Sequence, residues 1–164
     1  HSKGQYTVLL EWRMIMEYHI RAMQEQDIPF VSQIENQIFS LPWSEKSFRD
    51  AAANPDNVYL VCECTGEIAG YCGMWTVMGE GNVTNVAVHP AYRRMGVAEA
   101  LLKEMEKKAK EKDVTIFFLE VRQSNEAAKQ LYNKLGYNPI GVRKRFYEKP
   151  VEDAIVMSKT TYTV

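Results

Sequence analysis

Two arginines and a glycine stand where an extended segment gives way to a helical one, in NVAVHPAYRRMGVAEALL at residues 85–102. A helix N-terminus carries unpaired N–H groups and about half a positive charge, which makes it a ready site for an anion. Gly96 lets the backbone approach a phosphate closely, and the guanidinium groups add charge. The segment is a candidate pyrophosphate site, with an ordinary exposed turn as the alternative. Its residues are Arg93, Arg94, Met95, Gly96, Val97 and Ala98.

A carboxylate interrupts an apolar stretch further along the chain, TIFFLEVRQ at residues 115–123. In a strand, Glu120 points to the same side as Ile116 and Phe118. Burying a carboxylate is costly unless it is paired, so this residue needs a partner or a chemical role. Two interpretations remain open, an ion pair with Arg122 and a part in catalysis.

The spacing of apolar residues predicts the elements that position these groups. We expect helices within residues 26–39, 41–54, 96–111 and 124–137. We expect strands at 18–23, 57–64, 67–77, 82–89, 114–122, 138–148 and 151–159. Asp27 and Ser44 are predicted N-caps of the first two helices, and Gly136 is predicted to close the last one. The strand at 114–122 is apolar on both sides, which predicts a central strand covered on both faces.

The order of these elements predicts an α/β fold with a mixed sheet. The strand at 82–89, the helix at 96–111 and the strand at 114–122 form a βαβ crossover, so these two strands should be parallel neighbours. The other strands follow one another as hairpins and should pair antiparallel. The expected architecture is a central, mostly antiparallel sheet with one parallel crossover, flanked by helices.

Length and charge limit the function classes. The chain has 164 residues, which fits one domain, and we expect it to span residues 16–164 after an added or upstream segment at 1–15. Twenty basic and twenty-one acidic side chains give a net charge of −1, which argues against nucleic-acid and membrane partners. Three cysteines do not form a disulfide framework, and they fit a cytoplasmic location.

The cysteines are also poor candidates for a metal site. Cys62 and Cys64 should share one face of a strand, and a simple hairpin register places Cys72 opposite Tyr59 on the other face. Thiols on two faces cannot converge on one ion. We therefore expect no bound metal, and we expect the cysteines to pack as small apolar residues.

Three segments together resemble the GCN5-related N-acetyltransferase (GNAT) superfamily. They are PWSEKSF, the run NVAVHPAYRRMGVAEALL, and LEVRQSNEAAKQLYNKLGY, in the order and spacing of that family. Within it the chain is most similar to the RimI-like ribosomal-protein alanine N-acetyltransferases, over roughly residues 18–159. The resemblance implies acetyl-CoA as co-substrate, a pyrophosphate loop at Arg93–Ala98, and a strand that bends at a bulge and binds the pantetheine arm through Val86, Ala87 and Val88.

The resemblance also implies roles for single residues. It makes Glu120 the general base and Tyr132 the general acid; without it, Tyr132 between Leu131 and Leu135 would be a core residue. Asn125 is an N-cap by position and a cofactor contact by resemblance. Trp43 and Tyr147 are implied contacts of the acceptor, although Trp43 could simply pack ahead of the helix at 41–54.

The implied activity is Nα-acetylation of a protein N-terminus, with an alanine-starting ribosomal protein as the acceptor. Two alternatives remain at this point. One is acetylation of a small amine or a protein lysine on the same fold. The other is an acyl-CoA-binding protein without catalytic activity.

Overall fold

The computed structural model describes residues 6–11 and 14–161. Its helices are α1 (Ile28–Ile38), α2 (Glu45–Ala53), α3 (Val97–Lys110) and α4 (Glu126–Lys134), with 3₁₀ turns at Glu25–Asp27 and Pro90–Tyr92. Its strands are β1 (Tyr6–Glu11), β2 (Met14–Ala22), β3 (Val58–Cys64), β4 (Glu67–Val77), β5 (Glu80–Val88), β6 (Ile116–Arg122), β7 (Asn138–Tyr147) and β8 (Glu152–Thr160). None of the helices in this described part is long and apolar enough to cross a membrane.

Strand β1 goes beyond the prediction, which excludes residues 1–15 from the fold. Residues 1–5 and 12–13 lie outside the described residues. β1 pairs antiparallel with β2, from Tyr6 opposite His19 to Glu11 opposite Met14. The division into a segment 1–15 and a domain 16–164 stays a prediction.

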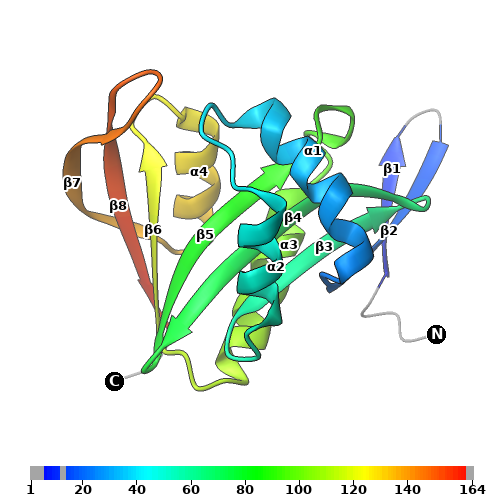
Figure 1. Ribbon diagram of the computed structural model, residues 1–164, viewed down its shortest axis with the longest axis horizontal. Coiled ribbons are helices and arrows are strands. Elements are labelled where there is room, and N and C mark those ends of the chain that lie inside the picture. Colours follow the sequence, from blue (N-terminus) through cyan, green and yellow to red (C-terminus); the bar gives the residue numbers. More distant parts are fainter. Residues whose placement is uncertain (1–5, 12–13, 162–164) are drawn as a thin grey trace.

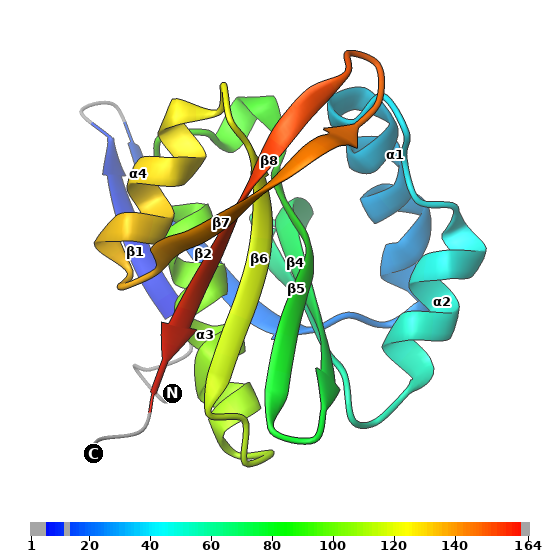
Figure 2. The same cartoon turned by 90° about the vertical axis from the view of Figure 1, so that its left-hand side faces the viewer.

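The strands form one sheet in the order β1-β2-β3-β4-β5-β6-β8-β7. Every neighbouring pair is antiparallel except β5 and β6, which are parallel. Helices α1 and α2 cover one face of the sheet, and α3 and α4 cover the other (Figures 1 and 2). The predicted fold class, a mostly antiparallel sheet with one parallel crossover and flanking helices, is confirmed.

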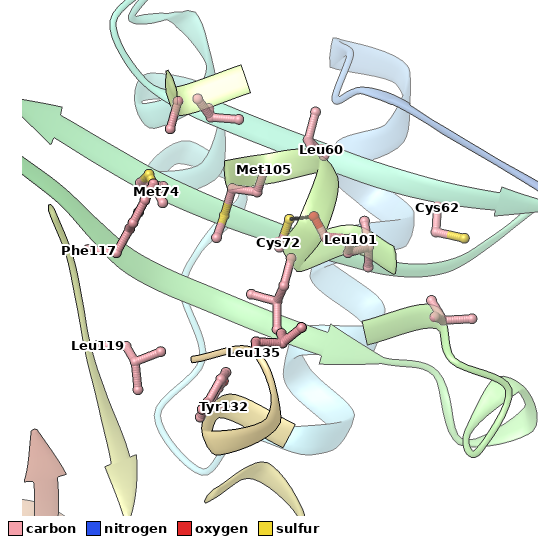
Figure 3. Close-up of a cluster of buried hydrophobic side chains, with 14 of the residues drawn as sticks. Leu60, Cys62, Cys72, Met74, Leu101, Met105, Phe117, Leu119, Tyr132 and Leu135 are labelled. Atoms are coloured by element: carbon pink, nitrogen blue, oxygen red, sulfur yellow. Dashed lines mark hydrogen bonds between the residues drawn. The ribbon is translucent and has the colours of Figure 1, made fainter. Parts of the chain in front are cut away.

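Each face of the sheet buries its own apolar cluster. The larger cluster lies against α3 and α4 and includes Leu101, Met105, Phe117 and Leu119 (Figure 3). The smaller one lies under α1 and α2 and includes Val31, Ile34, Phe48, Tyr59 and Tyr71. Burial of apolar surface on both faces fixes the sheet between its two helical layers.

Of the two predicted N-caps, Ser44 is confirmed, whereas Asp27 stands at the predicted position without capping α1. The Ser44 hydroxyl accepts a hydrogen bond from the Ser47 N–H at 3.1 Å, as an N-cap should. Asp27 precedes α1 as predicted, but it makes no cap hydrogen bond to that helix. Its carboxylate instead accepts from the Arg21 guanidinium at 2.7 and 2.8 Å and from the Gln24 N–H at 2.7 Å. A hydrogen bond between a guanidinium and a carboxylate is stronger than one from a backbone N–H. The Asp27 carboxylate therefore faces Arg21 and not the N-terminus of α1.

Strand β6 lies inside the sheet, but the prediction that both its faces are covered is wrong. Phe117, Leu119 and Val121 are buried against α3 and α4. Phe118 and Glu120, on the opposite face, are only partly buried. The alternating burial along β6 shows that only the face toward α3 and α4 is fully covered.

The predicted register of the cysteines is also wrong. A bulge between β3 and β4 shifts the pairing, so Cys72 lies opposite Leu60 instead of Tyr59. Cys62, Cys64 and Cys72 therefore face the same cluster, where all three are buried. Figure 3 shows Cys62 and Cys72 in this cluster. Burial raises the pKa of Cys72, and raises that of Cys62 to about 12, so these thiols pack as apolar groups, as predicted.

A second bulge bends β5. Gly73 of β4 pairs with Asn85 while the next residue, Met74, pairs with Val83, so Thr84 is the additional residue. The Thr84 hydroxyl is 2.8 Å from the hydroxyl of Tyr59 on β3. The Tyr59 ring crosses directly over Gly73, the cross-strand partner that has no side chain. Gly73 thus makes room for the ring that holds the bulge.

This packing predicts a large cost for Gly73→Ala. An added Cβ would overlap the Tyr59 ring, so the ring must move and its bond to Thr84 must break. We expect the free energy of unfolding, measured by urea denaturation, to fall by about 1–3 kcal/mol. Gly141→Ala is the control, because an added Cβ there meets nothing within 4 Å and should change stability by less than about 0.5 kcal/mol. Equal losses in the two variants would contradict the role of the ring contact.

Candidate active site

Strands β5 and β6 begin side by side and then separate. Three successive residue pairs join them, ending with Asn82 opposite Phe118. Beyond that pair the two strands diverge toward their C-terminal ends (Figure 1). The separation begins just before the bulge at Thr84 and opens a slot in the middle of the sheet.

The backbone of β5 has free hydrogen-bonding groups along this slot. The His89 N–H donates to the Ala69 oxygen of the preceding strand at 2.8 Å. Because bonded pairs alternate in an antiparallel ladder, Ala87 shares its bonds with β4, whereas Val86 and Val88 direct theirs toward the slot. Val86 and Val88 are only partly buried, so the outward backbone groups remain accessible to a partner from the slot. The slot can therefore accept an extended ligand that pairs with Val86 and with the N–H of Val88, whose oxygen already accepts from the Arg93 side chain.

At the end of β5 the chain enters the predicted pyrophosphate segment. Arg93 and Arg94 are exposed, and the Arg93 Nε donates to the Val88 oxygen at 3.3 Å. Gly96 precedes α3 with φ +77°, and a Cβ built there would meet nothing within 4 Å. Val97 is buried in the core, so only its backbone N–H is available at the helix end. The segment combines positive charge, unpaired N–H groups and open space at one point.

A cleft of about 660 Å³ lies where the strands separate. Residues from both faces of the sheet line it, so it passes between β5 and β6. The predicted site residues that line it are Trp43, Val86, Glu120, Asn125, Tyr132 and Tyr147. Those that do not line it are Ala87, Val88, Arg93, Arg94, Met95, Gly96, Val97 and Ala98, which follow along β5 and the start of α3.

Glu120 faces this cleft from the α1–α2 side of β6. Its carboxylate is 3.7 Å from the Arg143 Nε, and its side chain is 28% exposed. The alternative of a pair with Arg122 is wrong, because the Arg122 guanidinium bonds to Glu152 at 3.2 Å and stacks 4.4 Å from the ring centre of Tyr147. Glu120 is thus only loosely paired and can accept a proton in the cleft.

Tyr132 reaches the cleft from α4, on the other face of the sheet. Its ring is almost fully buried and lies beside Leu135 in the cluster of Figure 3. The turn that ends α4 is a Schellman motif, in which the Tyr137 N–H donates to the Tyr132 oxygen and the Gly136 N–H to the Asn133 oxygen. A phenol of ordinary pKa, about 10, already keeps its proton at neutral pH, and burial raises the pKa of Tyr132 further, so its hydroxyl is present as a donor.

The remaining predicted residues border the same cleft. The Asn125 side chain accepts from the Ala128 N–H at 3.1 Å, which confirms it as the N-cap of α4. Trp43 stacks against Phe48, at 5.3 Å between ring centres, so it packs ahead of α2 and also lines the cleft. Burial and the negative charge of Glu120 raise the pKa of Tyr147 to about 12.

Sequence reasoning missed Glu35, a buried carboxylate of α1 in the cleft wall. Its side chain accepts hydrogen bonds from the Tyr71 hydroxyl at 2.6 Å, the Trp43 N–H at 3.0 Å and the Asn85 amide at 3.5 Å. A signal was available, because Glu35 follows Ile28 and Val31 at helical spacing and so falls on the apolar face of α1.

The described residues contain no group of three or more His, Cys, Asp or Glu side chains that could hold a metal ion. The groups that the cleft presents are a carboxylate, a phenol and backbone N–H groups. A carboxylate that can take a proton and a phenol that can give one lie on opposite faces of the same opening. This arrangement suits proton transfer on the two sides of a group bound between the strands.

Comparisons with known proteins agree with this geometry. The chain matches the acetyltransferase (GNAT) family over residues 28–137. It is 42% identical over 139 residues to the putative [ribosomal protein bS18]-alanine N-acetyltransferase of Bacillus subtilis, covering 84% of this chain and 92% of that protein. It is 36% identical over 143 residues to the [ribosomal protein bS18]-alanine N-acetyltransferase of Escherichia coli K12, with coverage of 85% and 95%.

A solved structure gives the same result. The crystal structure of the ribosomal-protein-S18-alanine N-acetyltransferase from Escherichia coli superposes with a TM-score of 0.82 at 31% identity, covering 90% of this chain and 96% of that one. Fold and sequence together define an acetyltransferase of the GNAT family, to which the chain belongs. Within the family it is an N-acetyltransferase of the RimI-like group.

The open space at Gly96 leads to a prediction about binding of coenzyme A. In Gly96→Val the new side chain fills the space next to the helix N-terminus, and we expect the Kd for coenzyme A, measured by calorimetry, to rise at least about tenfold. Gly66→Val is the matched control, since Gly66 also has a positive φ and open surroundings but lies in the β3–β4 turn. Both variants should lose similar stability. Equal affinity for coenzyme A in the two variants would argue against an anion site at Gly96.

Proposed function

We propose that this protein transfers an acetyl group from acetyl-CoA to the α-amino group of a protein N-terminus, and that its acceptor is an alanine-starting ribosomal protein. The relatives described above carry that activity in their names. The observation that carries the proposal is the single cleft into which Glu120 and Tyr132 point from opposite faces of the sheet. A base on one side and an acid on the other is what acyl transfer to an amine requires.

The residues that would hold acetyl-CoA follow the course of β5. The backbone groups of Val86 and Val88 suit the pantetheine arm, with Ala87 between them tied to β4. The segment Arg93–Ala98 suits the pyrophosphate, and Asn125 at the start of α4 borders the slot between these two regions. The unpaired strand edge and the open space at Gly96 both fit this ligand.

Glu120 is the proposed base for the first step, which is removal of a proton from the acceptor ammonium group. A protein α-amino group has a pKa of about 7.7–8.0, so at neutral pH most of it is an ammonium ion that cannot attack a carbonyl. Glu120 takes that proton, directly or through a water, on the α1–α2 side where Trp43 and Tyr147 border the acceptor. A positioned base of this kind typically contributes about 10²- to 10⁴-fold in rate.

The later steps, attack on the acetyl group and departure of the thiol, involve the β5 backbone at the slot and Tyr132 on the α4 face of the sheet. Acetyl-CoA supplies an activated acetyl thioester. The N–H group of Val86, which borders the cleft, can hold the negative charge on the acetyl oxygen, and one such donor is worth about 10²–10³ in rate. The amine nitrogen bonds to the acetyl carbon, the carbon–sulfur bond breaks, and Tyr132 gives its proton to the departing sulfur. The nitrogen releases its second proton as the amide forms, and Tyr132 regains a proton from solvent. Transfer is direct, because the cysteines of the described residues are all buried away from the cleft.

The same proposal assigns the enzyme to the cytoplasm, where an N-terminus of a ribosomal protein becomes available. The three cysteines are free thiols, which a reducing compartment allows. Nucleic acid and membranes are not part of the proposal.

Removing the base or the acid should lower turnover without affecting binding of coenzyme A. We expect kcat to fall by about 10²-fold or more in Glu120→Gln and by about tenfold or more in Tyr132→Phe. Glu104→Gln is a matched control for the first, because Glu104 has a similar exposure and lies 3.9 Å from Lys108. Tyr137→Phe is the control for the second, since its hydroxyl has no hydrogen-bond partner among the described residues.

Steady-state kinetics with a fixed peptide would measure these effects, and calorimetry would follow coenzyme A. Normal kcat in both Glu120→Gln and Tyr132→Phe would reject the assigned roles.

A panel of acceptors tests the acceptor class. Peptides that start with Ala, Ser or Met should be compared with a polyamine and with a peptide whose only free amine is a lysine side chain. We expect acetylation at the α-amine, fastest for the alanine peptide, with the position located by mass spectrometry. Preference for the polyamine or the lysine would replace the proposed acceptor. Binding of coenzyme A with no acetylated product would indicate a protein without catalytic activity.

A further inference from the structure

Glu35 lies in the last turn of α1 and its side chain is almost completely buried, at 2% exposure for the residue. No lysine, arginine or histidine lies within ion-pair distance of it among the residues that the structure describes. All its side-chain partners are neutral donors. A buried carboxylate without a counter-cation is costly, and its hydrogen bonds must offset that cost.

These hydrogen bonds come from three different parts of the fold. Tyr71 belongs to β4, Trp43 lies in the segment between α1 and α2, and Asn85 stands next to the bulge in β5. Burial and the Glu35 charge raise the pKa of Tyr71, so its hydroxyl remains a donor. The bonds to Tyr71 and Trp43, at 2.6 and 3.0 Å, are short, whereas the bond to Asn85 is long at 3.5 Å.

The bond to Trp43 is a backbone bond, and it closes a loop. The α1 helix ends at Ile38, and the chain returns so that the Trp43 N–H meets the Glu35 side chain eight residues earlier. The enclosed segment 39–43 forms one wall of the cleft through Phe39, Leu41 and Trp43. Phe39 and Leu41 are large exposed apolar residues, so their own burial does little to fix this wall.

We infer that Glu35 is a positioning residue for the acceptor, which holds segment 39–43 in place against the sheet on the Glu120 side of the cleft. The inference rests on the proposed function, since it is the acceptor peptide that would contact this wall. Glu35 acts through the segment and does not touch the reacting atoms. Its loss should affect acceptor binding first, and acetyl-CoA binding little, because the bond toward β5 is the long one.

Glu35→Gln tests this with little change of shape. In the glutamine variant one of the two carboxylate oxygens is replaced by an NH₂ group, which cannot accept a hydrogen bond. The bond from Trp43 is then lost, or the bond with the Tyr71 hydroxyl is lost or reversed in direction. We expect the KM for an alanine-starting peptide to rise about tenfold, kcat to fall less than threefold, and the KM for acetyl-CoA to stay within twofold. Backbone hydrogen exchange in residues 39–43 should become faster, while exchange in α3 stays unchanged.

Glu106→Gln is the matched control. Glu106 is also a buried glutamate, at 5% exposure, but it pairs with Lys159 at 2.9 Å between α3 and β8, away from the cleft. The Glu106→Gln substitution should lower the Tm at least as much as Glu35→Gln does. It should leave the KM for the peptide and the KM for acetyl-CoA unchanged. Tyr71→Phe provides a second, milder test if Glu35→Gln folds poorly, with an expected rise of the acceptor KM of about threefold.

The outcomes separate this inference from the proposed function. If the unchanged enzyme acetylates no peptide N-terminus, the proposed function fails, and the exchange rates of residues 39–43 still decide the role of Glu35. If the unchanged enzyme is active and both Glu35→Gln and Tyr71→Phe keep its acceptor KM, the positioning role is overturned. A rise of the acceptor KM in Glu106→Gln equal to that in Glu35→Gln would also overturn it.

Discussion

Strand pairing between β5 and β6 stops after Asn82 and Phe118, and the rest of the site depends on that interruption. Unpaired backbone groups inside a sheet are unfavourable, so the fold must hold the strands apart by other contacts. The bulge at Thr84 bends β5, the Tyr59 hydroxyl binds that bulge, and the bare backbone of Gly73 makes room for the ring. The slot for a ligand thus exists because side chains on the α1–α2 face stabilise a break in the sheet.

Charge is divided along the same slot. Its far end, at Arg93 and Arg94, combines two cations with the positive end of α3, which suits a phosphate group. The side facing α1 and α2 carries the partly exposed carboxylate of Glu120, which suits an ammonium ion. The chain as a whole has a net charge of only −1, so each ligand is attracted by a local arrangement and the overall charge contributes little.

The amino-acid sequence predicted the order of elements from β2 onward, though not β1, and the side of β6 on which Glu120 lies, because both follow from short-range periodicity. It failed where a partner comes from elsewhere in the chain. Arg122 bonds to Glu152, and Asp27 bonds to Arg21 instead of capping α1. A bulge shifted the register of Cys72 by one residue, which no alternation pattern reveals. The roles of Glu120 and Tyr132 came from family resemblance, since neither residue type alone distinguishes catalysis from packing.

A cleft that passes through a sheet has two openings. Acceptor-side residues such as Trp43 border one opening, and the exposed Asn125 at the start of α4 borders the other. Under the proposed chemistry the acetylated polypeptide and free coenzyme A therefore form on opposite faces of the sheet. Neither product occupies the other's exit, so a long polypeptide can dissociate while coenzyme A is still bound.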